Sequence, residues 1–273
     1  MATVSDSLIS RSIPFKIVSW PSAVSTALPR STALIMSLLF TRPKLLSLLL
    51  LLVVPFPAYT QERTILVFGD SISAAYGMDP DKGWVHLLGE RLKREGITAR
   101  VVNASVSGET ALGGRNRIEQ ALSAHRPDII ILGLGANDGL RGTAIKTIYD
   151  NLAAIIEICQ RNNVVVLLAG MQLPPNYGMT YTRKFQDIYP QLAEYYQTGL
   201  IPFLLAGFGE NKAFFQSDGI HPTASAQKMI VENVWHVLQP MLHEHFIAAA
   251  RQDDLKKPAD RQADLPSVLM ADH

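Results

Sequence analysis

The stretch ILVFGDSISAAYG, residues 65–77, decides both how this chain folds and where its chemistry starts. Its first four residues are apolar and uninterrupted, a pattern typical of a strand that is buried on both faces. The chain then turns at Gly69 and presents Asp70 and Ser71 together. Gly-Asp-Ser is also ordinary turn composition, so the rest of the sequence must show whether Ser71 is a turn residue or a nucleophile.

Short apolar runs and helical periods alternate along the chain after this first strand. Four further runs of strand length occur at 99–104, 128–135, 163–170 and 200–205. Apolar residues at helical spacing occur in four other segments, at 83–96, 145–159, 185–195 and 226–238. Pro190 interrupts the third of these segments and predicts a kink or the start of a second helix. The alternation predicts an α/β fold in which helices cover both faces of a parallel sheet.

Composition limits the kind of protein that this chain can be. The 273 residues include 25 basic and 24 acidic side chains, so the net charge of +1 gives no reason to expect a nucleic-acid partner. The single cysteine, Cys159, excludes an intrachain disulfide and lies in an apolar helical pattern, where a core thiol is expected. No Cys/His cluster has zinc spacing. We expect a monomer that contains neither a metal nor a cofactor.

The first 60 residues have the pattern of a secreted protein. From Met36, a basic segment with Arg42 and Lys44 precedes an apolar run at 45–54, and proline and small residues follow. This is the order of a secretory signal peptide. The apolar run is about half the roughly 20 residues of a membrane span. We predict an over-long gene start at 1–35, a signal peptide at 36–60, no membrane span after cleavage and secretion into a bacterial periplasm; an uncleaved anchor is the alternative.

The remainder is predicted to be one domain at 61–245, followed by a disordered polar tail at 246–273. In an open parallel sheet the functional site lies beyond the carboxyl ends of the strands. The loops after the predicted strands carry a serine, a glycine, an asparagine, an aspartate and a histidine, namely Ser71, Gly108, Asn137, Asp218 and His221. We expect these residues to meet at one edge of the sheet.

Together, these five residues can carry out acyl transfer. Ser71 needs a base to act as a nucleophile, and His221 can take its proton. Asp218, three residues before the histidine, can orient the imidazole and stabilise its charged form. The backbone N–H groups of Ser71 and Gly108 and the side-chain amide of Asn137 can donate to an oxyanion. Each residue alone is typical of a turn, whereas their combination favours a catalytic site.

Four short blocks of the chain resemble the GDSL, or SGNH, hydrolase superfamily: FGDSIS, the glycine of SVSGET, GANDG and DGIHP. The resemblance covers residues 63–242 and is greatest to the bacterial secreted arylesterase, thioesterase and lysophospholipase branch. It implies a three-layer α/β/α sandwich whose flavodoxin-like sheet has five strands in the order 2-1-3-4-5. It also implies no metal, an oxyanion hole formed by Ser71, Gly108 and Asn137, and a triad of Ser71, Asp218 and His221.

Two segments of the chain bear on how far this resemblance extends. Ile72 stands where the name-giving motif has leucine, an apolar exchange that leaves the nucleophile assignment intact. The segment MQLPPNYGMTYTRKF at 171–185 is long and punctuated by proline and glycine. The family implies that it is a mobile flap over an acyl chain, and the alternative is a plain surface loop. The predicted substrate-binding residues on it are Leu173, Pro174, Asn176 and Tyr177.

The sequence therefore predicts a serine hydrolase that cleaves carboxylic esters or thioesters through an acyl-enzyme. Aryl esters, acyl thioesters and lysophospholipids are its candidate small-molecule substrates. A carbohydrate O-deacetylase is an alternative with the same chemistry, although the apolar segment at 171–185 favours longer acyl chains. A non-catalytic flavodoxin-like binding module is an alternative of another class. It would need a broken triad or a glycine-rich phosphate loop after the first strand, and the sequence has neither.

Overall fold

The computed structural model describes residues 63–247. The predicted gene extension at 1–35, the signal peptide at 36–60 and the tail from residue 248 onward lie outside the described residues. Helical structure continues past the predicted domain boundary at 245, because a final turn, His243–Ile247, follows the last helix. Phe246 in this turn is buried, and the guanidinium of Arg63 lies 5.5 Å from its ring centroid.

Five strands form one parallel sheet in the predicted order, β2-β1-β3-β4-β5. Their bounds are β1 Arg63–Gly69, β2 Ala99–Asn103, β3 Ile129–Gly133, β4 Val165–Ala169 and β5 Gly199–Ile201. Strands β1 and β3 lie inside the sheet, and their apolar side chains are buried on both faces. Because all five strands run the same way, their carboxyl ends lie at one edge, where the following loops meet.

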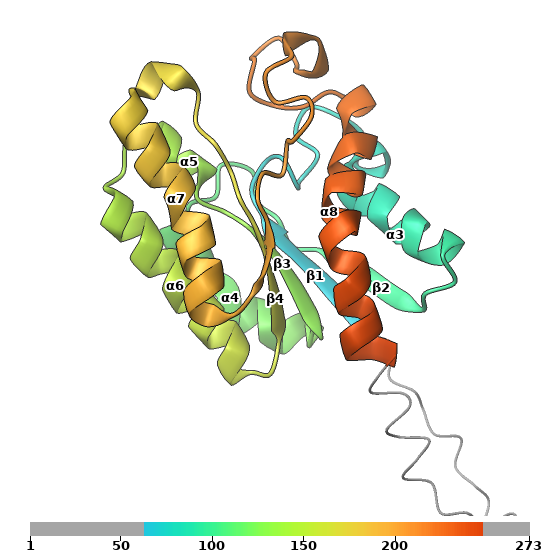
Figure 1. Cartoon of the computed structure of the whole chain (residues 1–273). Helices are drawn as coiled ribbons and strands as arrows, with labels where there is room; N and C mark the ends of the chain where they lie inside the picture. The colour runs from blue at the N-terminus through green and yellow to red at the C-terminus, as the bar shows by residue number, and fades with distance from the viewer. Residues whose placement is uncertain (1–62, 248–273) are drawn as a thin grey trace, which may run out of the picture. The chain divides into compact units, whose positions relative to one another are not determined.

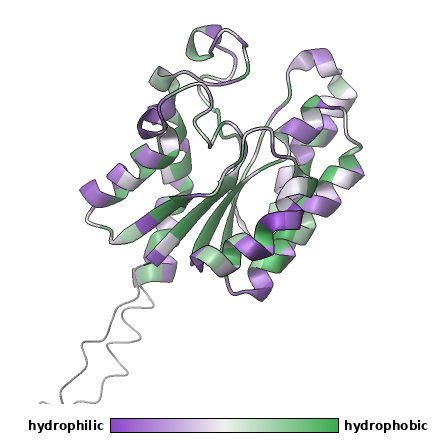
Figure 2. Cartoon of the chain, turned by 180° about the vertical axis from the view of Figure 1, so that it is seen from behind, coloured by the Kyte–Doolittle hydropathy of each residue, from purple (hydrophilic) through white to green (hydrophobic). Residues whose placement is uncertain are grey.

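Helices cover both faces of the sheet, which confirms the three-layer α/β/α arrangement (Figure 1). One face carries α3 Trp84–Arg94 and α8 Gln227–Leu242, which pack against each other. The other face carries α4 Ala111–His125, α5 Ala136–Leu140, α6 Ile145–Arg161 and α7 Met179–Tyr196. Figure 2 shows that the strands are largely apolar, whereas the helices carry polar side chains on their outer surfaces.

At two places where the sequence pattern is interrupted, a proline influences the observed element. The predicted run at 200–205 forms only the short strand β5, because Pro202 has no N–H with which to continue the ladder. No second helix starts at Pro190, which lies inside the continuous helix α7. Pro190 is exposed, so the backbone carbonyl that loses its donor can be hydrated, while the neighbouring Tyr189 and Leu192 are buried and hold the helix on the core.

Helix α4 has no long apolar stripe of the kind that predicts the other helices. Two adjacent glycines, Gly113 and Gly114, lie in its first turns. A Cβ atom at Gly114 would lie 2.3 Å from Leu134 Cδ1 and 3.2 Å from the Phe68 ring. Glycine therefore lets α4 approach the sheet closely, and this approach sets the position of the loop before α4, which carries Gly108.

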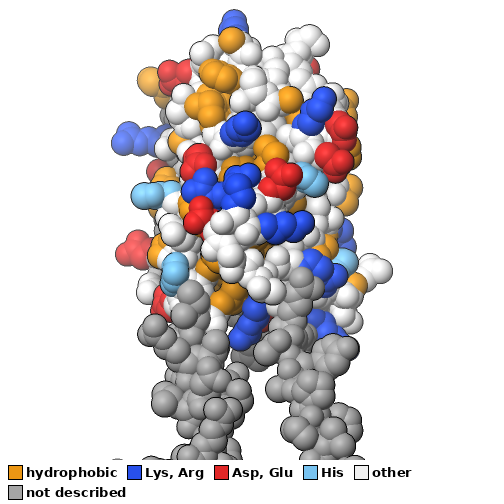
Figure 3. All heavy atoms as spheres, turned by 90° about the vertical axis from the view of Figure 1, so that its right-hand side faces the viewer, with side chains coloured by type: hydrophobic (Ala, Val, Ile, Leu, Met, Phe, Trp, Pro, Cys, Tyr) orange, Lys and Arg blue, Asp and Glu red, His pale blue; other side chains and the backbone are white. Residues whose placement is uncertain are grey.

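The outer surface over α3 and α8 carries charges of both signs (Figure 3). For example, Arg91 on α3 forms ion pairs with Glu95, which directly follows α3, and with Glu232 on α8. Figure 3 shows no single-sign field over this face, as expected from a net charge of +1. Among the described residues, no helix has the length and apolar character needed to cross a bilayer.

Candidate active site

Ser71 lies in the tight turn that follows β1 at the carboxyl edge of the sheet. The turn is closed by a hydrogen bond of 2.9 Å from the Ala74 N–H to the Asp70 carbonyl. Gly69 is required for space, because a Cβ atom there would lie 2.7 Å from Ser73 Oγ. The strand thus fixes the serine backbone, and only 8% of Ser71 is exposed.

The predicted histidine and aspartate lie on the loop before α8, and the structure brings both to Ser71. His221 Nε2 lies 2.8 Å from Ser71 Oγ, and His221 Nδ1 lies 2.7 Å from Asp218 Oδ2. The other carboxylate oxygen, Asp218 Oδ1, accepts hydrogen bonds from the backbone N–H groups of Ile220 and His221. Three residues predicted from separate blocks therefore form one continuous chain of hydrogen bonds.

The protonation state of Asp218 decides which imidazole nitrogen carries the hydrogen. The backbone N–H of His221, then its side chain and the backbone N–H of Ile220, lower the pKa of Asp218 from 3.8 to about 2. An ionised carboxylate can only accept, so Nδ1 must donate to it. In neutral His221 this leaves Nε2 as the acceptor for the Ser71 hydroxyl, which is the tautomer that a general base needs.

Gln216 fastens the loop of His221 to the loop of Ser71. Its backbone N–H donates to the His221 carbonyl at 2.8 Å. Its side-chain Nε2 donates to the Tyr76 carbonyl at 2.8 Å. Two loops that are far apart in the sequence are thereby held in a fixed relation at the site.

The predicted oxyanion donors also lie at this edge of the sheet. Gly108 has φ +78°, a left-handed conformation that favours glycine. The Asn137 side-chain amide donates to the Glu109 carbonyl at 2.9 Å and makes only a long contact of 3.4 Å with Asp70 Oδ2. Among the described residues, the backbone N–H groups of Ser71 and Gly108 donate to no other backbone group. Three hydrogen-bond donors are thus available at the carboxyl edge of the sheet.

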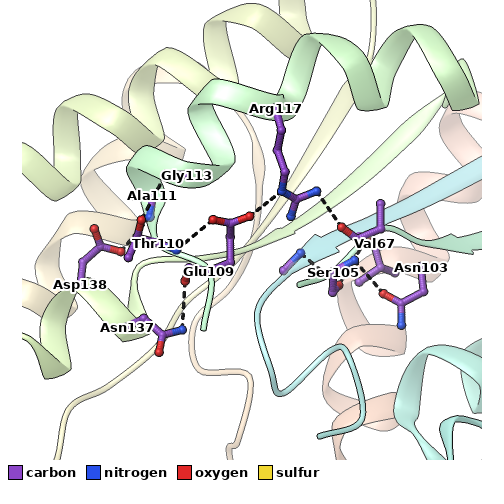
Figure 4. Close-up of polar contacts among 12 residues, drawn as sticks. Val67, Asn103, Ser105, Glu109, Thr110, Ala111, Gly113, Arg117, Asn137 and Asp138 are labelled. Carbon is purple, nitrogen blue, oxygen red and sulfur yellow. Dashed lines mark hydrogen bonds and ion pairs between the residues drawn. The ribbon is translucent and has the colours of Figure 1, made fainter. Parts of the chain in front are cut away.

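A partly buried network holds the loop that carries Gly108 (Figure 4). Arg117 on α4 pairs with Glu109 at 2.5 Å and donates to the Ala104 carbonyl at 2.8 Å. Its guanidinium lies 3.8 Å from the centroid of the Phe68 ring on β1. Asp138 on α5 accepts a hydrogen bond of 2.7 Å from the Ala111 N–H at the start of α4. Both ends of the loop are therefore attached to the core.

Asp70 and Asp138 support neighbouring parts of the site. Asp70 Oδ1 accepts from the Ile72 N–H at 3.0 Å, next to the nucleophile position. Burial raises the pKa of Asp70 from 3.8 to about 6, and it raises the pKa of Asp138 as well. Neither carboxylate makes a hydrogen bond to His221 in the described structure, which leaves Asp218 as its partner.

The segment at 171–185 lies beside α5, which carries Asn137. Leu173 is 8% exposed and lies against Gly139, whereas Pro174 and Asn176 are exposed. The hydroxyl of Tyr177 donates to the Leu140 carbonyl at 3.0 Å. Only the first part of the segment is a loop, because α7 starts at Met179. These contacts place the segment against α5, the helix that carries Asn137.

The chain matches the GDSL-like Lipase/Acylhydrolase family over residues 67–229, which span all five residues of the site. The chain belongs to this family. The match includes the turn of Ser71, the loops of Gly108 and Asn137 and the loop of Asp218 and His221. Membership makes the chain a GDSL-type esterase, and the resemblance of the four blocks is thereby confirmed.

Three relatives of this hydrolase are named for the hydrolysis of esters or thioesters. Esterase TesA of Pseudomonas aeruginosa is 47% identical over 180 residues, which are 66% of this chain and 90% of TesA. The arylesterase of Vibrio mimicus is 40% identical over 70% of this chain and 95% of its own length. Thioesterase 1/protease 1/lysophospholipase L1 of Escherichia coli K12 is 36% identical over 66% of this chain and 85% of its own length. Ester hydrolysis is common to these names.

Solved structures show the same architecture. The crystal structure of TesA superposes with a TM-score of 0.65 and covers 66% of this hydrolase and all of TesA. The psychrotrophic esterase EstA of Pseudoalteromonas, inhibited by monoethylphosphonate, has a TM-score of 0.64 at 34% identity and covers 66% of this chain and 99% of EstA. Both comparisons agree with the five-stranded fold described above.

Sequence reasoning missed the residues that hold the site together. Glu109 lies in the SVSGET block, of which only the glycine was singled out, whereas Arg117 lies in a polar stretch without a motif and Gln216 precedes the histidine block. Tyr76, which lies against the His221 ring, was present in the opening stretch but had no partner that the sequence could indicate. Each of these residues acts through a contact with a distant segment, so local pattern carries no signal for it.

Proposed function

We propose that this hydrolase is a serine esterase that cleaves carboxylic esters or thioesters through Ser71, His221 and Asp218. The observation that carries the proposal is the chain of contacts from Ser71 Oγ to His221 Nε2 at 2.8 Å and from His221 Nδ1 to Asp218 Oδ2 at 2.7 Å. A nucleophile, its base and the group that orients the base are thus within hydrogen-bond distance. Cofactor chemistry is not needed for this reaction.

The geometry assigns one role to each residue. Ser71 Oγ attacks the carbonyl carbon while His221 Nε2 takes its proton, and Asp218 stabilises the imidazolium. The N–H groups of Ser71 and Gly108 and the Asn137 amide donate to the oxyanion. His221 then gives the proton to the leaving oxygen or sulfur, which leaves with the bonding electron pair and yields an acyl-enzyme. Water, deprotonated by His221, attacks this ester and releases the acid and Ser71.

The relatives indicate the substrate class. Their names include esterase, arylesterase, thioesterase and lysophospholipase. The substrates of these four activities are esters or thioesters of small molecules or lipids. We place the acyl chain on a wall formed by Leu173, Pro174, Asn176 and Tyr177. Leu173 is buried against α5 and supports this wall from beneath. Substrates with a medium or long acyl chain fit this wall better than acetyl groups do.

Secretion is part of the proposal. The basic and apolar pattern at 36–60 precedes the hydrolase domain as a signal peptide does. Expression of the full chain and of a chain beginning at residue 61, followed by fractionation of the cells, tests it. Activity in the periplasm only for the full chain supports export, and activity in the cytoplasm for both chains contradicts it.

Hydrolysis of p-nitrophenyl esters from C2 to C16 tests the catalytic assignment. Ser71→Ala is expected to lose about 10³-fold or more of kcat/KM, because it removes the nucleophile. Ser73→Ala is the matched control, since Ser73 lies in the same turn and is 3% exposed but makes no contact with His221. A fluorophosphonate probe should label the wild type and Ser73→Ala but not Ser71→Ala.

The outcomes separate the alternatives. An optimum at C6 or longer supports the acyl wall, whereas turnover of acetyl esters alone favours an O-deacetylase. Full activity and labelling in Ser71→Ala would show that Ser71 is a turn residue. Absence of both activity and labelling in the folded wild type would favour a binding module.

A further inference from the structure

Tyr76 is an exposed aromatic residue that directly contacts the proposed base. Its ring centroid lies 4.3 Å from that of His221, and the two ring planes make an angle of 36°. The residue is nevertheless 51% exposed. Ile220, next to His221 in the chain, is 47% exposed. Tyr76 and Ile220 therefore both expose apolar surface beside the proposed base.

The backbone holds Tyr76 in this place. Its N–H donates to the Ser71 carbonyl at 3.1 Å, and its carbonyl accepts from Gln216 Nε2 at 2.8 Å. The residues on both sides have left-handed backbone conformations, with φ of 56° at Ala75 and 72° at Gly77. Such a conformation is unfavourable for alanine. The turn is therefore built in a way that fixes the tyrosine ring beside His221.

The chemistry of the reaction says what must lie next to His221. The imidazole Nε2 returns its proton to the leaving oxygen, so that oxygen must come within about 3 Å of Nε2. In the proposed mechanism the acyl oxygen accepts hydrogen bonds from the donors of Gly108 and Asn137. The group attached to the leaving oxygen lies close to His221, whose ring Tyr76 contacts and whose neighbour in the chain is the exposed Ile220.

We infer that Tyr76 and Ile220 form a leaving-group subsite that favours aryl esters over alkyl esters. This inference rests on the proposed function. An aromatic ring and an aliphatic side chain offer apolar contact to a flat ring, and an aromatic pair adds to the binding free energy beyond buried area. The hydroxyl of Tyr76 forms no hydrogen bond within the described part of the chain, so the ring rather than the hydroxyl makes the subsite.

Two butyrate esters with activated leaving groups test the inference: phenyl butyrate and 2,2,2-trifluoroethyl butyrate. Both form the same butyryl-enzyme, so kcat/KM reports the step in which the leaving group departs. Tyr76→Ala is expected to lower kcat/KM for the phenyl ester about five- to tenfold more than for the trifluoroethyl ester. Tyr76→Phe keeps the ring and should retain the wild-type ratio. Ile220→Ala should lower the ratio less than Tyr76→Ala.

The control is Tyr195→Ala on α7, which removes another tyrosine that is 74% exposed and should change neither rate constant. An equal loss for both esters with an altered pH profile would mean that Tyr76 only positions His221, and it would overturn the subsite. An unchanged ratio in a folded Tyr76→Ala variant would also overturn it. Failure of the proposed function itself would be seen separately, as full activity in Ser71→Ala.

Discussion

Asn137 and His221 both lie at the carboxyl edge of the sheet, but the contacts that hold them differ in kind. Asn137 belongs to a side where Asp70, Asp138 and the start of α4 are buried. His221 belongs to a loop held by hydrogen bonds from its own neighbours, and the side chain of its partner Asp218 is 37% exposed. One side is thus part of the core, and the other is a surface loop.

The difference has a physical consequence. On the buried side, removal of a polar partner leaves another polar group unsatisfied in a region without water, so activity and stability fall together. On the exposed side, water can replace a lost partner, so activity can fall while the fold remains stable. The expected effects below test this contrast, from the largest to the smallest.

Asp218→Asn on the exposed side is expected to lower kcat by about 10³- to 10⁴-fold. The asparagine carbonyl can still accept the backbone N–H groups, but its amide donates toward Nδ1. That favours the tautomer with the hydrogen on Nε2, which cannot accept the Ser71 proton. The melting temperature should change little. A large loss of stability would contradict the contrast, and an unchanged kcat would remove Asp218 from the mechanism.

Asn137→Ala on the buried side is expected to lower kcat by about 10²- to 10³-fold, because one oxyanion donor is lost. It should also lower the free energy of unfolding by about 1 kcal/mol, since the Glu109 carbonyl loses its donor. Steady-state kinetics and urea denaturation measure the two effects. Asn162→Ala, at the far end of α6 with a local hydrogen bond to Ile158, is the control and should leave kcat unchanged.

Asp70 should make stability depend on pH in a defined window. Its pKa rises from 3.8 in the unfolded chain to about 6 in the fold, so the fold binds the proton more tightly. The contribution of Asp70 to stability is then fully present below pH 3.8 and is lost as pH rises to about 6, by roughly 3 kcal/mol at most. Asp218 acts in the opposite direction and at lower pH, because its pKa falls to about 2 and its contribution is lost as pH drops from 3.8.

Asp70→Asn tests this window, because asparagine cannot ionise yet keeps an oxygen for the Ile72 N–H. Relative to the wild type, the variant should gain stability between pH 4 and pH 7, as measured by denaturant unfolding at several pH values. A stability difference that stays constant over this range would show that the carboxyl group is ionised throughout.

Asp138→Ala should lower the free energy of unfolding by about 1–3 kcal/mol. The Ala111 N–H, in a residue that is 0% exposed, then has no acceptor. Asp138→Asn keeps a carbonyl oxygen at this position and should lose less, which separates the hydrogen bond from the charge. Equal losses in both variants would show that the charge, and not the hydrogen bond, holds the start of α4.

Much of the fold could be read directly from the sequence. Uninterrupted apolar runs predict buried parallel strands because both faces of such strands contact helices. Sequence pattern is less informative where tertiary packing overrides local preference. No second helix starts at Pro190, because Tyr189 and Leu192 are buried and hold α7 on the core, and no apolar stripe predicts α4, where Gly114 packs against Leu134 and Phe68. In each case a contact with another element, rather than a neighbour in the chain, decides the conformation.

The sequence by itself determined the order of the five strands and of four of the helices, together with the five residues proposed for catalysis, because pattern and local spacing are written along the chain. Only the tertiary structure decided how those residues are held. The network of Arg117 and Glu109 and the contact between Tyr76 and His221 join segments that are separate in the sequence. Residues of such pairs meet because a parallel sheet brings the loops after its strands to one edge. Their contacts are therefore set by the fold and not by neighbours in the chain.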